Sequence, residues 1–156
     1  MAEKKYTPMM QHYLKMKEEN PDSILFYRLG DFYEMFFEDA KLVSQELDLV
    51  LTGRSAGVEE KVPMCGIPFH AANSYIQRLV KKGYKVAICE QLEDPSSAKG
   101  LVDRGIIKII TPGTYMDATM DAKSTNYMAS CDVSSFEITV IYCELSTGEL
   151  KYQTLQ

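Results

Sequence analysis

Short apolar runs that alternate with segments of helical periodicity are the feature that most limits the fold of this 156-residue sequence. Largely apolar runs occupy residues 24–27, 49–51, 84–89 and 106–110, and an aromatic-rich run occupies residues 32–37. Strands that are apolar along their whole length, rather than at alternate residues, are typical of sheets covered on both faces. We therefore expect an α/β fold, with a mixed β-sheet flanked by helices on both faces.

Three segments have the apolar period of helices that pack on one side. The first begins at Thr7-Pro8, a hydroxyl cap followed by proline, and ends at Asn20-Pro21. The second covers residues 40–47, and the third covers residues 72–80 before a glycine. Residues 53–63 have the composition of a loop. The predicted order is α-β-β-α-β-α-β-β, in one domain over residues 1–112.

The remaining residues predict the beginning of a second domain. Residues 113–126 have little periodic apolar content and resemble a linker, whereas residues 127–133, 136–145 and 149–155 resemble strands. Two or three strands alone do not make a stable domain. We therefore expect residues 127–156 to be an incomplete β-hairpin of a second domain, and the sequence to be a fragment.

The charge distribution leaves the class of partner open. The chain has 17 Lys and Arg against 22 Asp and Glu, a net charge of −5, whereas nucleic-acid-binding domains usually carry a basic surplus. However, the charge is uneven, because residues 31–48 are acidic and residues 78–85 carry four bases and no acid. Solvated helix faces are the ordinary interpretation of both runs.

Several functional classes lack their sequence signals. There is no phosphate-binding loop, dinucleotide fingerprint or nucleophile elbow, and two histidines leave little room for a catalytic triad. The four cysteines form no C-x-x-C pair, so we expect no zinc site and a reducing, cytoplasmic location. No apolar run approaches the length of a membrane span, and no secretory signal is visible. We expect neither a catalytic residue nor a membrane partner.

Residues 27–37 are the most unusual segment, with five aromatic residues among eleven. In an extended chain, residues two apart share a face, so Phe32 and Glu34 point the same way and Tyr33 points the opposite way. An unpaired buried carboxylate is costly, which favours an exposed position for both side chains. An exposed aromatic ring on a rigid sheet suits stacking on a flat ligand.

Two other interpretations remain open for this segment. In the first, Phe32 is a core residue of a protein-interaction module, with Glu34 at its edge. In the second, the acidic residues Asp31, Glu34, Glu38 and Asp39 bind Mg²⁺ in a nuclease. Magnesium sites need only one or two protein carboxylates, although no Lys or His accompanies these four.

Five blocks of sequence, in order and at matching spacing, resemble the N-terminal region of the bacterial MutS family of DNA mismatch-repair proteins. These blocks are Thr7-Pro8-Met9-Met10-Gln11, Leu25-Phe26-Tyr27-Arg28-Leu29-Gly30-Asp31-Phe32-Tyr33-Glu34, Pro63-Met64-Cys65-Gly66-Ile67-Pro68-Phe69-His70, Val86-Ala87-Ile88-Cys89-Glu90-Gln91 and Thr111-Pro112-Gly113-Thr114. The resemblance implies a mismatch-recognition domain at residues 1–112. Residues 127–156 more weakly resemble the first strands of the MutS connector domain. Phe69 stands where a Tyr is common in the family.

The resemblance implies that the Phe-x-Glu motif falls on Phe32 and Glu34. Phe32 would enter the minor groove and stack on a mispaired base, while Glu34 would hydrogen-bond that base. The family places flanking DNA contacts at Leu29, Gly30, Asp31, Arg54 and Met64. For the longer protein, the resemblance implies ATP and Mg²⁺ as cofactors of an ATPase domain outside these residues. It also implies a homodimer, a MutL-type partner and a bacterial cytoplasmic, nucleoid-associated location.

Elementary chemistry agrees with these implied roles. The minor groove displays a degenerate hydrogen-bond code, so base readout alone would not find arbitrary mispairs. A mispair is weakly stacked, and wedging and kinking the duplex there costs less than at a matched pair. The ring of Phe32 would therefore test deformability, and Glu34 would disfavour any duplex that offers it no hydrogen.

Overall fold

The computed structural model describes residues 6–93, 102–114 and 127–155. The chain divides into two compact units at the junction between Pro112 and Gly113. The elements of the first unit are α1 (Pro8–Glu19), β1 (Ser23–Leu29), β2 (Phe32–Phe36), α2 (Phe37–Leu47), β3 (Thr52–Arg54), β4 (Val62–Pro68), the 3₁₀ turn η1 (Phe69–Ala71), α3 (Ala72–Lys81), β5 (Lys85–Gln91) and β6 (Arg104–Ile110).

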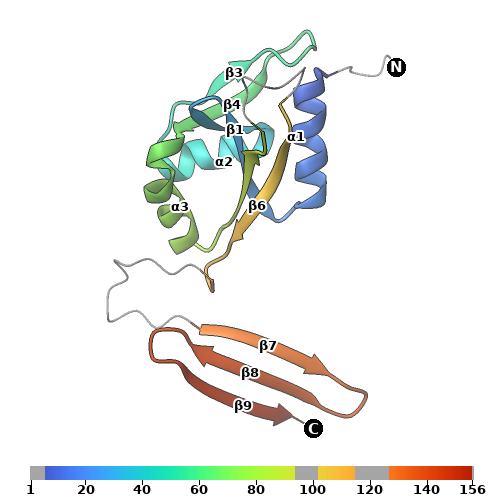
Figure 1. Cartoon of the computed structure of the whole chain (residues 1–156), viewed down its shortest axis with the longest axis vertical. Coiled ribbons are helices and arrows are strands. Elements are labelled where there is room, and N and C mark those ends of the chain that lie inside the picture. The colour runs from blue at the N-terminus through green and yellow to red at the C-terminus, as the bar shows by residue number, and fades with distance from the viewer. Residues whose placement is uncertain (1–5, 94–101, 115–126, 156) are drawn as a thin grey trace. The chain divides into compact units, whose positions relative to one another are not determined.

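The six strands of the first unit form one mixed sheet with the order β3-β4-β2-β1-β5-β6. Strands β1 and β5 are parallel, and every other neighbouring pair is antiparallel. Helix α1 covers one face of the sheet, and α2 and α3 cover the other (Figure 1). The predicted mixed sheet with helices on both faces is confirmed.

The two faces of the sheet follow from strand alternation. On one face, Leu25 and Tyr27 of β1 pack against Met10 and Tyr13 of α1, and all four side chains are buried. On the other face, the Cys65 thiol of β4 donates a hydrogen bond of 3.5 Å to a backbone carbonyl of α2. Apolar side chains on both sides of the sheet explain why its strands lack the alternating polar pattern.

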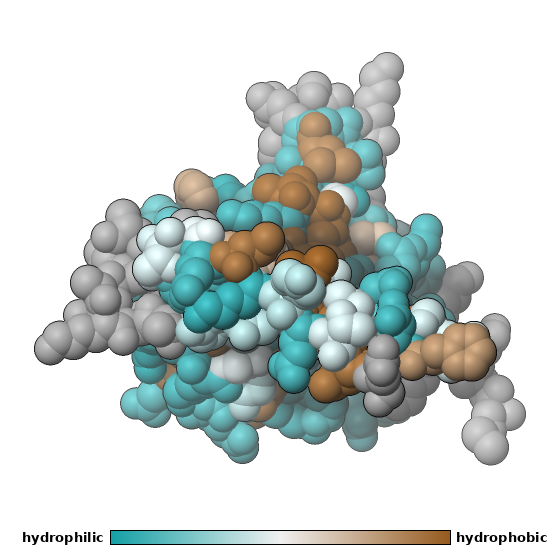
Figure 2. Space-filling view, turned by 90° about the horizontal axis from the view of Figure 1, so that it is seen from below, coloured by the Kyte–Doolittle hydropathy of each residue, from teal (hydrophilic) through white to brown (hydrophobic). Residues whose placement is uncertain are grey.

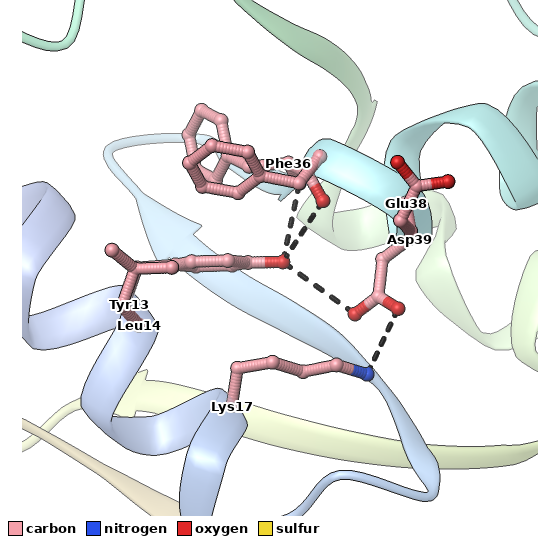
Figure 3. Close-up of a pocket in the computed structure, with 7 residues that line it drawn as sticks. Tyr13, Leu14, Lys17, Phe36, Glu38 and Asp39 are labelled. Carbon is pink, nitrogen blue, oxygen red and sulfur yellow. Dashed lines mark hydrogen bonds and ion pairs between the residues drawn. The ribbon is translucent and has the colours of Figure 1, made fainter.

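The Asp39 carboxylate of α2 lies beside Lys17 and Tyr13 of α1 (Figure 3) and also contacts β1 near the start of that strand. This carboxylate is buried, accepts the backbone N–H of Leu25 at 2.9 Å, and lies 2.9 Å from the ammonium of Lys17 on α1. The Tyr13 hydroxyl lies 3.5 Å from the same carboxylate, and it accepts the backbone N–H of Phe36 at 3.2 Å. Burial beside this carboxylate raises the pKa of Tyr13. These contacts fix α1, β1 and α2 around the strand that carries the candidate site.

The region between α2 and α3 differs from the prediction. The apolar run at residues 49–51 is not a strand, because α2 ends at Leu47, its C-cap Asp48 is left-handed, and the first extended residue is Thr52. The predicted loop at residues 53–63 contains the rest of β3 and the start of β4. Strand β4 was not predicted, although it pairs with both β2 and β3.

The second unit is a three-stranded antiparallel sheet of β7 (Tyr127–Val133), β8 (Ile138–Glu144) and β9 (Glu149–Leu155). The buried Glu144 carboxylate accepts backbone N–H groups of Ser146 at 3.2 Å and Thr147 at 2.7 Å, which closes the turn after β8. Both faces of this sheet carry exposed apolar side chains: Tyr127, Met128, Val133, Ile138, Ile141, Leu150, Tyr152 and Leu155. Apolar residues also stand among polar ones on the surface shown in Figure 2. Residues 115–126 of the predicted linker lie outside the described residues.

Candidate nucleic-acid interface

A tight turn between β1 and β2 presents Phe32 at the surface. Leu29 and Phe32 are paired across the two strands, and Gly30 and Asp31 form the connection. Gly30 has φ +57°, a left-handed conformation that glycine adopts without steric cost. Phe32 is therefore the first residue of β2, and 46% of its surface is exposed.

Phe32 and Glu34 share one face of the sheet, as the strand period predicts. Both flank Gly66 of β4, because a Cβ atom at Gly66 would lie 3.5 Å from Cγ of Glu34 and 3.8 Å from Cδ1 of Phe32. Tyr33 points to the other face, where it is buried and its ring centroid lies 5.9 Å from that of Phe26. The ring and the carboxylate thus lie side by side on a packed platform.

Glu34 has an ionic partner that sequence reasoning did not foresee. Its carboxylate forms an ion pair with the guanidinium of Arg54, which comes from the edge strand β3. The Arg54 side chain is 36% exposed, whereas the Glu34 side chain is only 14% exposed. Considered from the sequence, Glu34 lacked a partner. The structure corrects this interpretation and the predicted exposure of Glu34: Arg54 pairs with its carboxylate, and the side chain is largely shielded from solvent.

The other flanking positions divide into two groups. Gly30 and Asp31 are exposed at the turn. Leu29 and Met64 are partly buried and pack against the cluster of apolar residues beneath α1. Strand register places Leu29, Phe32, Glu34, Met64 and Arg54 on the same face of the sheet, with the turn at its rim.

The opposite side of the turn is supported by Arg28, which sequence reasoning missed. Its Nε–H donates to the Gly30 carbonyl, and its guanidinium carbon lies 3.7 Å from the centroid of the Phe69 ring. The same guanidinium lies 3.3 Å from the carboxylate of Glu90, which also accepts the Tyr33 hydroxyl. Burial, with Glu90 nearby, raises the pKa of Tyr33 to about 12. The two contacts with Glu90 join residues 62 and 57 positions apart in the sequence, so no local sequence motif predicts them.

A second arginine, Arg104, forms a hydrogen bond with the backbone near the C-terminal end of β1. Arg104 of β6 is buried; its Nε–H donates to the Arg28 carbonyl at 2.8 Å and an Nη1–H donates to the Val102 carbonyl at 2.7 Å. Its guanidinium carbon lies 5.4 Å from the centroid of the Tyr27 ring. Side chains from β5 and β6 therefore fix the end of β1 that leads into the turn carrying Phe32, which limits the motion of that turn.

The geometry argues against the two alternatives considered from the sequence. Phe32 is too exposed to be a core residue. The four acidic residues proposed for a magnesium site separate: Glu34 pairs with Arg54, Asp39 pairs with Lys17, Glu38 pairs with Lys41 at 2.7 Å, and Asp31 lies exposed at the turn. Within residues 6–93, 102–114 and 127–155, no group of three or more His, Cys, Asp or Glu side chains is arranged to hold a metal ion. Among the same residues, no helix has the length and apolar character that a membrane span requires.

The fold and the site define an α/β domain that presents an exposed aromatic residue and a carboxylate together on one face of its sheet. A sequence model of the family described as MutS domain I matches residues 7–119. The chain belongs to this family. It is 62% identical over 144 residues to the DNA mismatch repair protein MutS of Clostridium botulinum (strain Loch Maree / Type A3), and 58% identical over 146 residues to that of Clostridium tetani (strain Massachusetts / E88).

These alignments cover nearly the whole chain but a small part of each relative. They include 92% of this chain and 16% of the C. botulinum protein, and 93% of this chain and 17% of the C. tetani protein. The chain thus spans about one sixth of the length of the curated relatives that it matches.

Proposed function

We propose that this chain recognises mispaired or looped sites in double-stranded DNA as part of DNA mismatch repair. The observation that carries the proposal is the exposed Phe32 ring beside the Glu34 carboxylate on a rigid sheet. Membership of the MutS domain I family and the similarity to DNA mismatch repair proteins support it.

In the proposed mechanism, Phe32 acts as a wedge in the minor groove. Unstacking a base step costs a few kcal/mol, and the cost is lower at a mispair because its stacking is already weak. Stacking of a base on an aromatic ring returns about 1–3 kcal/mol and does not depend on which base is present. Because the turn already holds the Phe32 ring in place, binding requires no further ordering of this segment. The difference in binding free energy between mispaired and matched DNA therefore comes from the cost of deforming the duplex.

Glu34 supplies discrimination in this mechanism. An ionised carboxylate only accepts hydrogen bonds, and it is repelled by phosphates. The imino N–H of a mispaired T or G can donate to it, whereas a purine N7 can bond to it only if the acid is protonated. A duplex that offers no hydrogen is therefore penalised. Leu29, Gly30, Asp31, Arg54 and Met64 are the proposed flanking contacts.

The wider context of the chain is also proposed from the family. Residues 1–112 are the recognition domain, residues 113–126 a linker and residues 127–156 the first strands of a connector domain. We place ATP and Mg²⁺ binding, homodimer formation and the contact with a MutL-type partner in the longer protein, acting on DNA in the bacterial cytoplasm. We expect this chain itself to have no catalytic residue and no cofactor.

Binding of defined duplexes tests the proposal. Because the chain carries a net charge of −5, we expect weak and salt-sensitive DNA binding on its own. The measurement therefore uses a chimera in which these residues replace the matching part of the full-length C. botulinum relative. Tighter binding to a duplex with one T opposite G than to its matched counterpart, at fixed salt, supports the proposal. Equal binding to the two duplexes would overturn it.

A further inference from the structure

The ion pair between Glu34 and Arg54 occupies the groups that the proposed function assigns to DNA. Arg54 is the more exposed partner, at 36% against 14%, and it lies on the short edge strand β3. Its guanidinium can therefore be reached by a ligand without movement of the sheet. Any base contact by Glu34 must either include Arg54 or displace it.

The chemistry of the two groups permits an exchange. A guanidinium presents a planar fork of N–H donors that fits a carboxylate and a phosphate equally well. Glu34, in contrast, is largely shielded from water, and an unpaired shielded carboxylate is costly. Glu34 should release Arg54 only when another donor takes its place.

We infer that Arg54 exchanges between Glu34 and a DNA phosphate, so that base readout by Glu34 controls a contact with the DNA backbone; this inference rests on the proposed function. At a mispair, the imino N–H of the base replaces Arg54 on the carboxylate, and the freed guanidinium binds a phosphate. On matched DNA, Glu34 receives no donor and keeps Arg54, so the phosphate contact is not made. Arg54 thus contributes to specificity, because it contacts a DNA phosphate at a mispair but not on matched DNA.

The dependence of affinity on salt reports this exchange directly. Each phosphate neutralised on B-DNA contributes about 0.9 to the slope of log K against log salt. In the chimera described above, we expect Glu34→Gln to steepen the slope for matched DNA by about 0.9 and to leave the slope for mispaired DNA unchanged. We expect Arg54→Gln to lower the slope for mispaired DNA by about 0.9 and to leave that for matched DNA unchanged. The double variant Glu34→Gln/Arg54→Gln should show the same two salt slopes as Arg54→Gln alone.

Matched controls separate this effect from a general change of charge. Glu38→Gln and Lys41→Gln remove the partners of another ion pair, on α2, and should leave the slopes on both duplexes unchanged. Arg54→Lys retains the positive charge and should restore the slope that Arg54→Gln loses on mispaired DNA.

Two results overturn the inference. Equal slope changes on both duplexes for Arg54→Gln mean that Arg54 is a constant phosphate contact, and no slope change on either duplex means that it never leaves Glu34. The proposed function survives both results if the parent chimera still prefers mispaired DNA. If the parent shows no preference, the proposed function and this inference fail together.

Discussion

Gly66 lies directly across from Glu34 on the neighbouring strand, and its missing side chain leaves the space that Glu34 and Phe32 flank. A single Cβ atom there would meet the Tyr33 carbonyl oxygen at 3.4 Å and Cγ of Glu34 at 3.5 Å, which are ordinary contact distances. Branched side chains have no such room. The candidate site therefore depends on a residue that bears no functional group.

We expect Gly66→Val to reduce binding of mispaired DNA at least tenfold, because its methyl groups displace the Glu34 carboxylate and the Phe32 ring. Gly66→Ala is the matched control, and we expect it to bind within about twofold of the parent because its Cβ makes only ordinary contacts. Fluorescence anisotropy of labelled duplexes in the chimera measures both variants. Equal loss in the two variants would contradict this account.

Phe32→Ala should abolish the preference for mispaired DNA and leave the fold intact. The ring is nearly half exposed, so its removal opens no core cavity, whereas the lost stacking is worth about 1–3 kcal/mol. Paired titrations of mispaired and matched duplexes at one salt concentration measure the preference, and thermal unfolding of the chain checks the fold. A variant that retains the parent's preference would count against the wedge.

Glu34→Gln should strengthen binding to matched DNA, because it removes a negative charge that faces the phosphates and releases Arg54. The affinity for matched duplex should rise several-fold, and the preference for mispaired DNA should fall. Competition binding at constant ionic strength measures both quantities. Weaker binding of matched DNA by this variant would be incompatible with a discriminating role for the carboxylate.

Asp39→Asn should lower the free energy of unfolding by about 2 kcal/mol, since the buried carboxylate holds Lys17 and the backbone of β1 through charged hydrogen bonds. Glu38→Gln is its control. That side chain is 83% exposed in a surface ion pair, and its loss should change stability by less than about 0.5 kcal/mol. Urea unfolding followed by circular dichroism measures both, and equal destabilisation would refute the anchoring role of Asp39.

The buried thiols of Cys65 and Cys89 should react with iodoacetamide differently from the exposed thiol of Cys131. Burial raises the pKa of Cys65 to about 12 and that of Cys89 to about 12, whereas Cys131 is exposed. Cys131 should be alkylated in the folded chain, while Cys65 and Cys89 react only after unfolding. Peptide mass spectrometry follows each site.

The same shifts carry a consequence for stability. Because the folded pKa values of Cys65 and Cys89 are raised, the folded state is favoured at neutral pH, and this contribution is lost as the pH rises above the ordinary thiol pKa of 9.0 toward about 12. Rapid alkylation of Cys65 or Cys89 in the folded chain at pH 8 would contradict their buried positions.

The sequence predicted best those features that depend on a single helix or strand. Residues 72–80 have a complete apolar stripe, and α3 forms there. The shared face of Phe32 and Glu34 followed from strand alternation alone. By contrast, β4 contains Pro63, Gly66 and Pro68, residues that are depleted in strands, and was not predicted. It forms because pairing with β2 and β3 on its two sides outweighs the weak local preference.

The missed strand also explains the missed ion pair. Arg54 reaches Glu34 across β4, so the contact can be inferred only when the order β3-β4-β2 is known. Likewise, the contact of Arg28 with Glu90 requires the parallel pairing of β1 with β5. The candidate residues were visible in the sequence, whereas the contacts that position them depend on tertiary structure.

The parallel pairing of β1 with β5 has a consequence for synthesis on the ribosome. Ser23 at the start of β1 pairs with Lys85, so one side of the central strand stays open until more than sixty further residues have been made. The hairpin of β1 and β2 can close early, but the Glu90 carboxylate that holds Arg28 emerges late. Pauses in translation before residue 91 would leave an apolar strand edge unprotected, and a chaperone that shields such edges would improve the yield of correctly folded protein.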